Sequence, residues 1–139
     1  MQKVDFYILE GNKQRAMLFV CELAQKYFQE QKPIYIYADS QNTAELLDNL
    51  LWTYRDDSFL PHGIDEENTS LPIRIGYDDI ATHHQGLLIN LHPDIPSQFQ
   101  QFNHIIEIVF SDPLVQQLAR NRYKQYREKG IELITHKEK

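Results

Sequence analysis

Short runs of apolar residues recur along the chain and predict the strands of a sheet. The runs are rich in Ile, Val, Leu, Phe and Tyr, the composition typical of β-strands. Several runs are apolar at nearly every position, which indicates that they are buried on both faces of the sheet. The predicted strands are residues 4–9, 34–38, 73–76, 87–90 and 105–110.

Between these runs the apolar residues recur at helical spacing. Residues 14–31 repeat an apolar side chain every three or four positions, and Lys32-Pro33 ends this predicted helix. Ser40 is a suitable N-cap for a second helix, and a third covers about residues 112–129. The apolar positions of the first two helices are Ala16, Val20, Leu23 and Tyr27, followed by Ala44, Leu47 and Leu51.

The order strand, helix, strand, helix predicts an α/β fold. A right-handed strand-helix-strand crossover leads to a largely parallel sheet with helices on both faces. The length of 139 residues and the hydrophobic content of 42% suit a single Rossmann-like domain, residues 1–139. Within this domain, the segment from about residue 56 to residue 72 is rich in acidic residues, Pro and Gly, so we predict an exposed acidic loop there.

The glycines and histidines give no sign of a cofactor site. The five glycines form neither a dinucleotide-binding nor a Walker-type motif, and Glu10 after the first strand would repel a phosphate. The six histidines lack the spacing of metal ligands. We therefore expect no cofactor, no metal and no catalytic residue. The alternative is a nucleotide- or nucleic-acid-processing enzyme that uses His92 and Asp94 in a crevice at the sheet end.

No segment of the chain predicts export or membrane insertion. The apolar run at the start is too short for a signal peptide, and no run approaches the roughly 20 apolar residues of a membrane span. We therefore expect a cytoplasmic protein with no membrane partner. Cys21 is the only cysteine, and its apolar neighbours at helical spacing predict a buried, inert thiol.

Cations and tyrosines interleave on the third predicted helix of an otherwise acidic protein. Residues 120–129 contain five cations and only Glu128 as a carboxylate, a net charge of +4, whereas the whole chain carries −6. Because a patch of this size displaces few phosphate counterions, we expect no direct specific nucleic-acid binding. The patch fits a compact acidic partner, or it is simply a solvated helix end that complements the helix dipole. One face of this helix carries Gln116, Arg120, Tyr123, Lys124 and Arg127, and another carries Val115, Leu118, Ala119 and Tyr126.

A second group of aromatic residues surrounds the acidic loop. Trp52 is the only tryptophan, and Phe59 follows it within the segment Ser58-Phe59-Leu60-Pro61-His62. These residues form either a buried corner of the core, which the sequence slightly favours, or an apolar anchor for another protein.

Three motifs of the chain resemble the chi subunit family of bacterial DNA polymerase III holoenzyme. They are Phe6-Tyr7-Ile8-Leu9, the Trp52 group with residues 58–62, and residues 117–127, QLARNRYKQYR. The resemblance covers nearly the full length and implies a non-catalytic, Rossmann-like accessory protein of the clamp loader. It also implies a bridge between the psi subunit and the acidic C-terminal tail of single-stranded DNA-binding protein.

The resemblance assigns a role to individual residues. Arg120, Tyr123 and Lys124 match the positions that bind the tail, and Val109 matches another position that lines the site. Gln116 stands where the family's best-known members have lysine, and Arg127 is a candidate to replace that charge. Trp52 and Phe59 match the positions used for psi, for which a helicase competes in some members.

Overall fold

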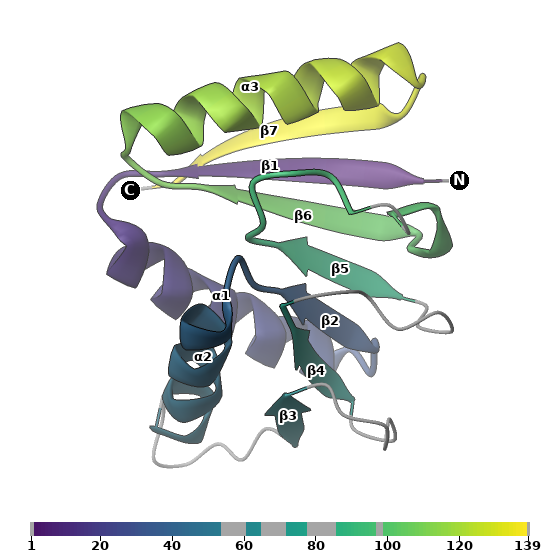
Figure 1. Ribbon diagram of the computed structural model, residues 1–139. Helices are drawn as coiled ribbons and strands as arrows, with labels where there is room; N and C mark the ends of the chain where they lie inside the picture. The colour runs from purple at the N-terminus through teal and green to yellow at the C-terminus, as the bar shows by residue number, and fades with distance from the viewer. Residues whose placement is uncertain (1, 54–60, 65–71, 78–85, 97–98, 139) are drawn as a thin grey trace.

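A seven-stranded sheet forms the centre of the protein in a computed structural model (Figure 1). The structure describes residues 2–53, 61–64, 72–77, 86–96 and 99–138. The strand order is β3-β4-β2-β5-β6-β1-β7, and each neighbouring pair is parallel. The strands are β1 Lys3–Leu9, β2 Ile34–Tyr37, β3 His62–Ile64, β4 Ile73–Gly76, β5 Leu87–Asn90, β6 His104–Val109 and β7 Glu132–Glu138.

Helices cover both faces of the sheet. Helices α1, Lys13–Gln29, and α2, Gln41–Thr53, pack on one face, and α3, Pro113–Glu128, packs on the other with the short 3₁₀ helix Phe99–Gln101. Two separate apolar clusters result, one on each side of the sheet. The predicted α/β, Rossmann-like fold with a parallel sheet and helices on both faces is confirmed.

Local sequence signals place the helix starts. The side chain of Asn12 accepts a hydrogen bond from the backbone N–H of Arg15 at the start of α1, and the Ser40 hydroxyl accepts one from Thr43 at the start of α2. Asp112 caps α3 by accepting from the N–H groups of Leu114 and Val115. These caps satisfy backbone donors that have no partner within the helix.

The central strands are buried on both faces, as their continuous apolar runs predicted. Every residue of β2, β4 and β5 is buried. Gly76 makes room for the side chain of Tyr35 on the neighbouring strand, since a Cβ at this position would lie 1.9 Å from the tyrosine oxygen. A larger residue at position 76 would therefore displace a buried aromatic ring.

Two strands were not predicted from the sequence. Strand β3 lies inside the predicted acidic loop, so that prediction is wrong for residues 62–64; residues 56–60 and 65–71 lie outside the described residues. His62 is buried, and its Nε2 lies 3.0 Å from the carbonyl oxygen of Asp48 on α2. Strand β7 lies at the edge of the sheet and carries three charged residues, Glu132, Lys137 and Glu138, which suit an edge strand but give little apolar signal.

A buried carboxylate joins β7 to the rest of the sheet. Asp5 on β1 forms hydrogen bonds with Nε2 of His104 on β6 and with Nε2 of His136 on β7. Burial alone would raise the pKa of Asp5, but the hydrogen bonds from His136 and His104 outweigh this effect and lower it. The ring of His136 also stacks on Tyr7 at 4.5 Å. These two histidines therefore have structural roles.

The remaining predictions about the core are also consistent with the structure. Cys21 is fully buried, and burial raises the pKa of its thiol to about 12, so the predicted inert thiol is confirmed. Over the ranges that the structure describes, no helix combines the length and apolar character that a membrane span requires.

Candidate functional site

Helix α3 has one buried face and one exposed face, as its sequence pattern predicted. Ala119 and Tyr126 are buried against the sheet, and Val115 and Leu118 are half-buried beside them. Gln116 and Tyr123 are half-buried next to this buried face, and the remaining residues of the predicted binding face are exposed: Arg120, Lys124 and Arg127. The helix therefore joins a core face to a face that is available to a partner.

Arg122 departs from the predicted basic patch. It is buried, and its Nε lies 3.0 Å from Oε1 of Glu107, which is fully buried on β6. Burial raises the pKa of Glu107, whereas Arg122 and the donors Asn90 and Tyr126 oppose the rise. The charge of Arg122 is therefore used inside the protein, and the net charge of +4 overstates what α3 offers to a partner.

A cavity of about 250 Å³ lies between α3 and the sheet, and we call it the α3 cavity. It brings together four residues of the predicted tail site, namely Gln116, Arg120, Tyr123 and Val109, whereas Lys124 and Arg127 lie on α3 outside its lining. The remaining lining residues are Phe6, Ile8, Ala119 and Thr135.

The α3 cavity combines an apolar interior with a positive charge. Phe6 and Tyr123 pack together with their ring centroids 5.3 Å apart. Arg120 donates a long hydrogen bond of 3.5 Å to the neutral side chain of Gln117, and it forms no ion pair with any described residue. Its guanidinium can therefore hold a carboxylate by two hydrogen bonds while the interior receives an apolar side chain.

Sequence reasoning missed part of this lining. Phe6 and Ile8 belong to a motif that the sequence analysis singled out, but their alternation in β1 showed only that they share a face. Thr135 comes from β7, whose register places it beside Phe6. No sequence signal pointed to Thr135, because β7 itself was not predicted.

Trp52 lies on the surface at the end of α2. Its side chain is 53% exposed, so the interpretation of Trp52 as a buried core corner is wrong. Its ring lies 4.9 Å from that of the buried His62, at an interplanar angle of 58°. Leu46, earlier on the same helix, is also exposed. Phe59, the other residue of the predicted psi site, lies outside the described residues.

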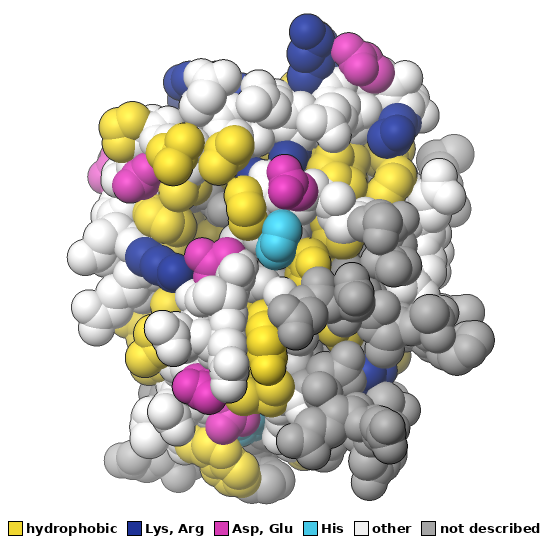
Figure 2. Space-filling view, in the orientation of Figure 1, with side chains coloured by type: hydrophobic (Ala, Val, Ile, Leu, Met, Phe, Trp, Pro, Cys, Tyr) yellow, Lys and Arg dark blue, Asp and Glu magenta, His cyan; other side chains and the backbone are white. Residues whose placement is uncertain are grey.

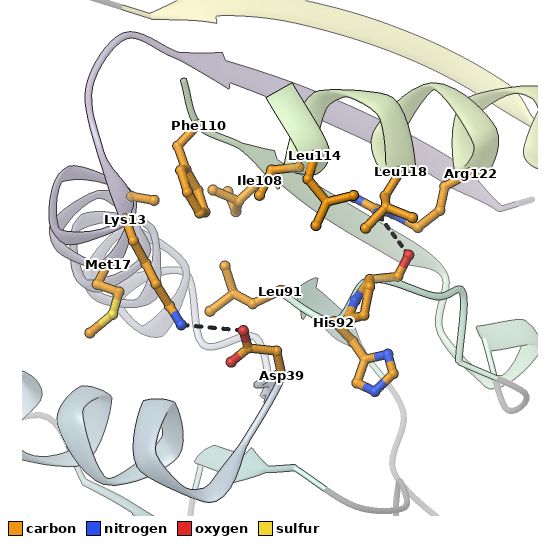
Figure 3. Close-up of a pocket in the computed structure, with 13 residues that line it drawn as sticks. Lys13, Met17, Asp39, Leu91, His92, Ile108, Phe110, Leu114, Leu118 and Arg122 are labelled. Carbon is orange, nitrogen blue, oxygen red and sulfur yellow. Dashed lines mark hydrogen bonds and ion pairs between the residues drawn. The ribbon is translucent and has the colours of Figure 1, made fainter. Parts of the chain in front are cut away.

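A second hollow, of about 340 Å³, lies at the carboxyl ends of the strands, where α/β folds often bind ligands. Figure 2 shows hydrophobic side chains gathered on this side of the molecule, next to basic, acidic and histidine side chains. The polar side chains that line the hollow already have partners (Figure 3): Lys13 pairs with Asp39 at 3.2 Å, and Arg122 donates to the carbonyl oxygen of Pro93 at 2.8 Å. The hollow is thus mostly apolar.

His92 and Asp94 do not form an acid-base pair in this crevice. Nδ1 of His92 accepts a hydrogen bond from the backbone N–H of Asp94, and the imidazole ring stacks on Tyr37 at 4.7 Å. His92 lines the crevice but Asp94 does not. This arrangement removes the geometric basis of the enzymatic alternative. The described residues also include no group of three side chains that could hold a metal ion.

The turn between β1 and α1 is closed by a serine. Gly11 adopts a φ of 116°, and its N–H lies 3.2 Å from Oγ of Ser111, the residue that follows the end of β6 by two positions. The carbonyl oxygen of Gly11 accepts a hydrogen bond from the N–H of Ser111 at 2.8 Å. Phosphate-binding α/β proteins hold the phosphate at this turn. Here the backbone N–H and carbonyl groups of Gly11 are bound to Ser111 instead.

Comparison with known proteins yields one family over almost the whole chain. Residues 1–134 match the family model described as DNA polymerase III chi subunit, HolC. The DNA polymerase III subunit chi of Pseudomonas aeruginosa is 33% identical over 138 residues, which cover 99% of this chain and 97% of that protein. The subunit chi of Haemophilus influenzae is 33% identical with 94% of each chain covered, and that of Escherichia coli is 28% identical with 97% of each covered.

Two solved structures with a similar fold are distant in sequence. A chain of the Saccharomyces cerevisiae complex of Dbp5 with Nup159 and Gle1 superimposes with a TM-score of 0.65 at 14% identity, and T4 UvsW with 0.70 at 8% identity. This chain covers 41% of each of those chains. At this level of identity the likeness concerns the α/β fold alone.

Proposed function

Since the chain belongs to the DNA polymerase III chi subunit family and is thus a non-catalytic accessory subunit of DNA replication, we propose that it bridges two partners. One is the psi subunit of the polymerase, and the other is the acidic C-terminal tail of single-stranded DNA-binding protein. The observation that carries the proposal is the α3 cavity, in which an apolar interior adjoins an arginine without an ion pair among the described residues.

The chemistry of the α3 cavity fits a chain end that carries an aromatic side chain and a free carboxylate. The aromatic side chain would enter between Phe6, Val109 and Tyr123, and the carboxylate would meet Arg120. Lys124 and Arg127 lie one and two turns further along α3, outside the cavity, where they would attract aspartates that precede the chain end. Gln116 would contribute an amide but no charge.

The second surface is formed by the exposed end of α2. A half-exposed tryptophan is a suitable anchor for a partner, because burying its ring gives a large apolar gain at low conformational cost. We propose that psi covers Trp52 together with Phe59, and that a helicase competes for the same surface. The two sites lie on opposite faces of the sheet, since α2 and α3 cover different faces. Both partners could therefore bind at once.

The tail site is tested by calorimetric titration with a synthetic acidic peptide that ends in phenylalanine. We expect the peptide with a free C-terminus to bind, and the same peptide amidated at its C-terminus to bind about tenfold more weakly, because a hydrogen bond to a charged group contributes about 1.5 kcal/mol or more. Equal binding of the two peptides would contradict the assigned role of the α3 cavity, and no binding of either would overturn the tail-binding function.

The psi site is tested by Trp52→Ala. We expect this variant to bind the psi subunit of the same organism about 1–2 kcal/mol more weakly, roughly fivefold to thirtyfold, and to bind the acidic peptide as the wild type does. Arg120→Ala is the matched control and should show the opposite pattern in the same two titrations. A Trp52→Ala variant with full affinity for psi would remove Trp52 from the interface.

A further inference from the structure

The positive charge of the α3 cavity lies at one point along its opening, at Arg120. Among the described residues, Arg120 is the only charged one that lines the cavity, and Gln116, one helical turn earlier, is neutral. An acidic tail carries several carboxylates, so a single guanidinium would leave some of them without a partner. A further cation near Gln116 would complement such a ligand better.

Strand β7 places a lysine next to this part of the cavity. Thr135 lines the cavity, and Lys137 follows it by two residues, so both side chains lie on the α3 face of the sheet. The register pairs Lys137 with Ile8, which also lines the cavity. Neighbouring strands are about 4.8 Å apart, so the lysine side chain can reach the cavity opening.

The position of Lys137 along the sheet corresponds to the early part of α3. Ile8 pairs with Val109 at the end of β6, and α3 begins four residues later, after the turn. Figure 1 shows the start of α3 and the end of β7 at the same end of the sheet. Arg127 belongs to the last turn of α3, about 10 Å along the helix axis from Arg120. Lys137 is therefore better placed than Arg127 to supply a charge near Gln116.

The charge of Lys137 is available to a ligand. The residue is exposed at the edge of the sheet, and no described residue forms an ion pair with it. The adjacent carboxylate, that of Glu138, belongs to the opposite face of the strand, and that of Asp112 is bound to the first N–H groups of α3. Neither neutralises the lysine by direct contact.

We infer that Lys137 is a further binding residue for the acidic ligand of the α3 cavity, and that it supplies from β7 the positive charge that α3 lacks at Gln116. The inference rests on the proposed function of the cavity. It assigns part of the site to the edge strand, so the ligand contacts α3 and β7 together. An aspartate that precedes the terminal residue of the tail is the group that Lys137 would attract.

The test uses Lys137→Ala in the full chain, titrated with the acidic peptide at about 50 mM salt. Because the charge pair is exposed, we expect a loss of affinity of roughly twofold to fivefold. With a peptide whose aspartates are replaced by asparagine, the same variant should bind as the wild type does. Lys32→Ala removes the same charge from an exposed position before β2, at the opposite end of the sheet, and serves as the matched control.

A second variant tests whether the two positions are equivalent. Gln116→Lys in the Lys137→Ala background should restore most of the lost affinity, because it places a cation at the same part of the opening. If wild-type protein binds the peptide and Lys137→Ala binds it as Lys32→Ala does, the inference is overturned while the proposed tail site stands. If the wild type does not bind the peptide, the proposed tail site is overturned and the role of Lys137 with it.

Discussion

We expect Arg122→Ala to lower the free energy of unfolding by about 3–5 kcal/mol, the cost of leaving a buried charge without its partner. Arg122 and Glu107 are both buried, and their side chains are joined by a contact of 3.0 Å. Of the described residues, the variant would leave Glu107 with only Asn90 and Tyr126 as hydrogen-bond donors, at 2.9 and 2.7 Å. It would also remove the donor to the carbonyl oxygen of Pro93. Urea unfolding followed by circular dichroism measures the change.

Two further variants test whether the loss of stability comes from the buried ion pair. Arg127→Ala removes an exposed cation from the same helix and should change the stability by no more than about 0.5 kcal/mol. In the double variant Arg122→Met with Glu107→Gln, neither charge of this buried pair remains, so the variant should recover much of the lost stability. If Arg122→Ala cost less than about 1 kcal/mol, the buried pair would contribute no more than an exposed one.

We expect Arg120→Ala to weaken binding of the acidic peptide by about 1.5–3 kcal/mol, roughly tenfold to more than a hundredfold, because it removes the guanidinium from the α3 cavity. The stability of the protein should hardly change, since Arg120 is exposed. Isothermal titration calorimetry with the free-carboxylate peptide measures the effect.

Two further variants, Arg120→Lys and Arg127→Ala, show whether binding depends on the geometry of the guanidinium or only on its positive charge. Arg120→Lys keeps the charge but loses the two parallel donors, so its affinity should lie between those of the wild type and Arg120→Ala. Arg127→Ala lies outside the cavity and should cost less than about threefold. Equal losses from Arg120→Ala and Arg127→Ala would show a diffuse attraction by the helix surface, without a specific carboxylate site in the cavity.

The roles of two arginines on α3 show what the sequence pattern left undecided. Arg120 and Arg122 are two residues apart, so they point about 200° away from each other around the helix. The sequence showed both as members of one basic run. Only the structure shows that Glu107, on a strand, takes up the charge of Arg122 and that Arg120 remains without an ion pair among the described residues.

The residues of the candidate sites were likewise predicted only in part from the sequence. The helical spacing of Arg120 and Tyr123 predicted a shared face, and the structure brings both into the α3 cavity together with Gln116. The exposure of Trp52 could not be predicted, because an aromatic residue at a helix end suits a core corner as well as an interface.

The sequence by itself determined the α/β class, five of the strands, the three helices and the amphipathic character of α3, because these depend on spacing between near neighbours. Only the tertiary structure decided the strand order, the membership of β3 and β7 in the sheet, and the lining of the α3 cavity. Phe6 and Thr135 lie at opposite ends of the chain and meet because β7 pairs with β1. Periodicity shows which side of an element is buried, but the partner depends on packing among distant segments.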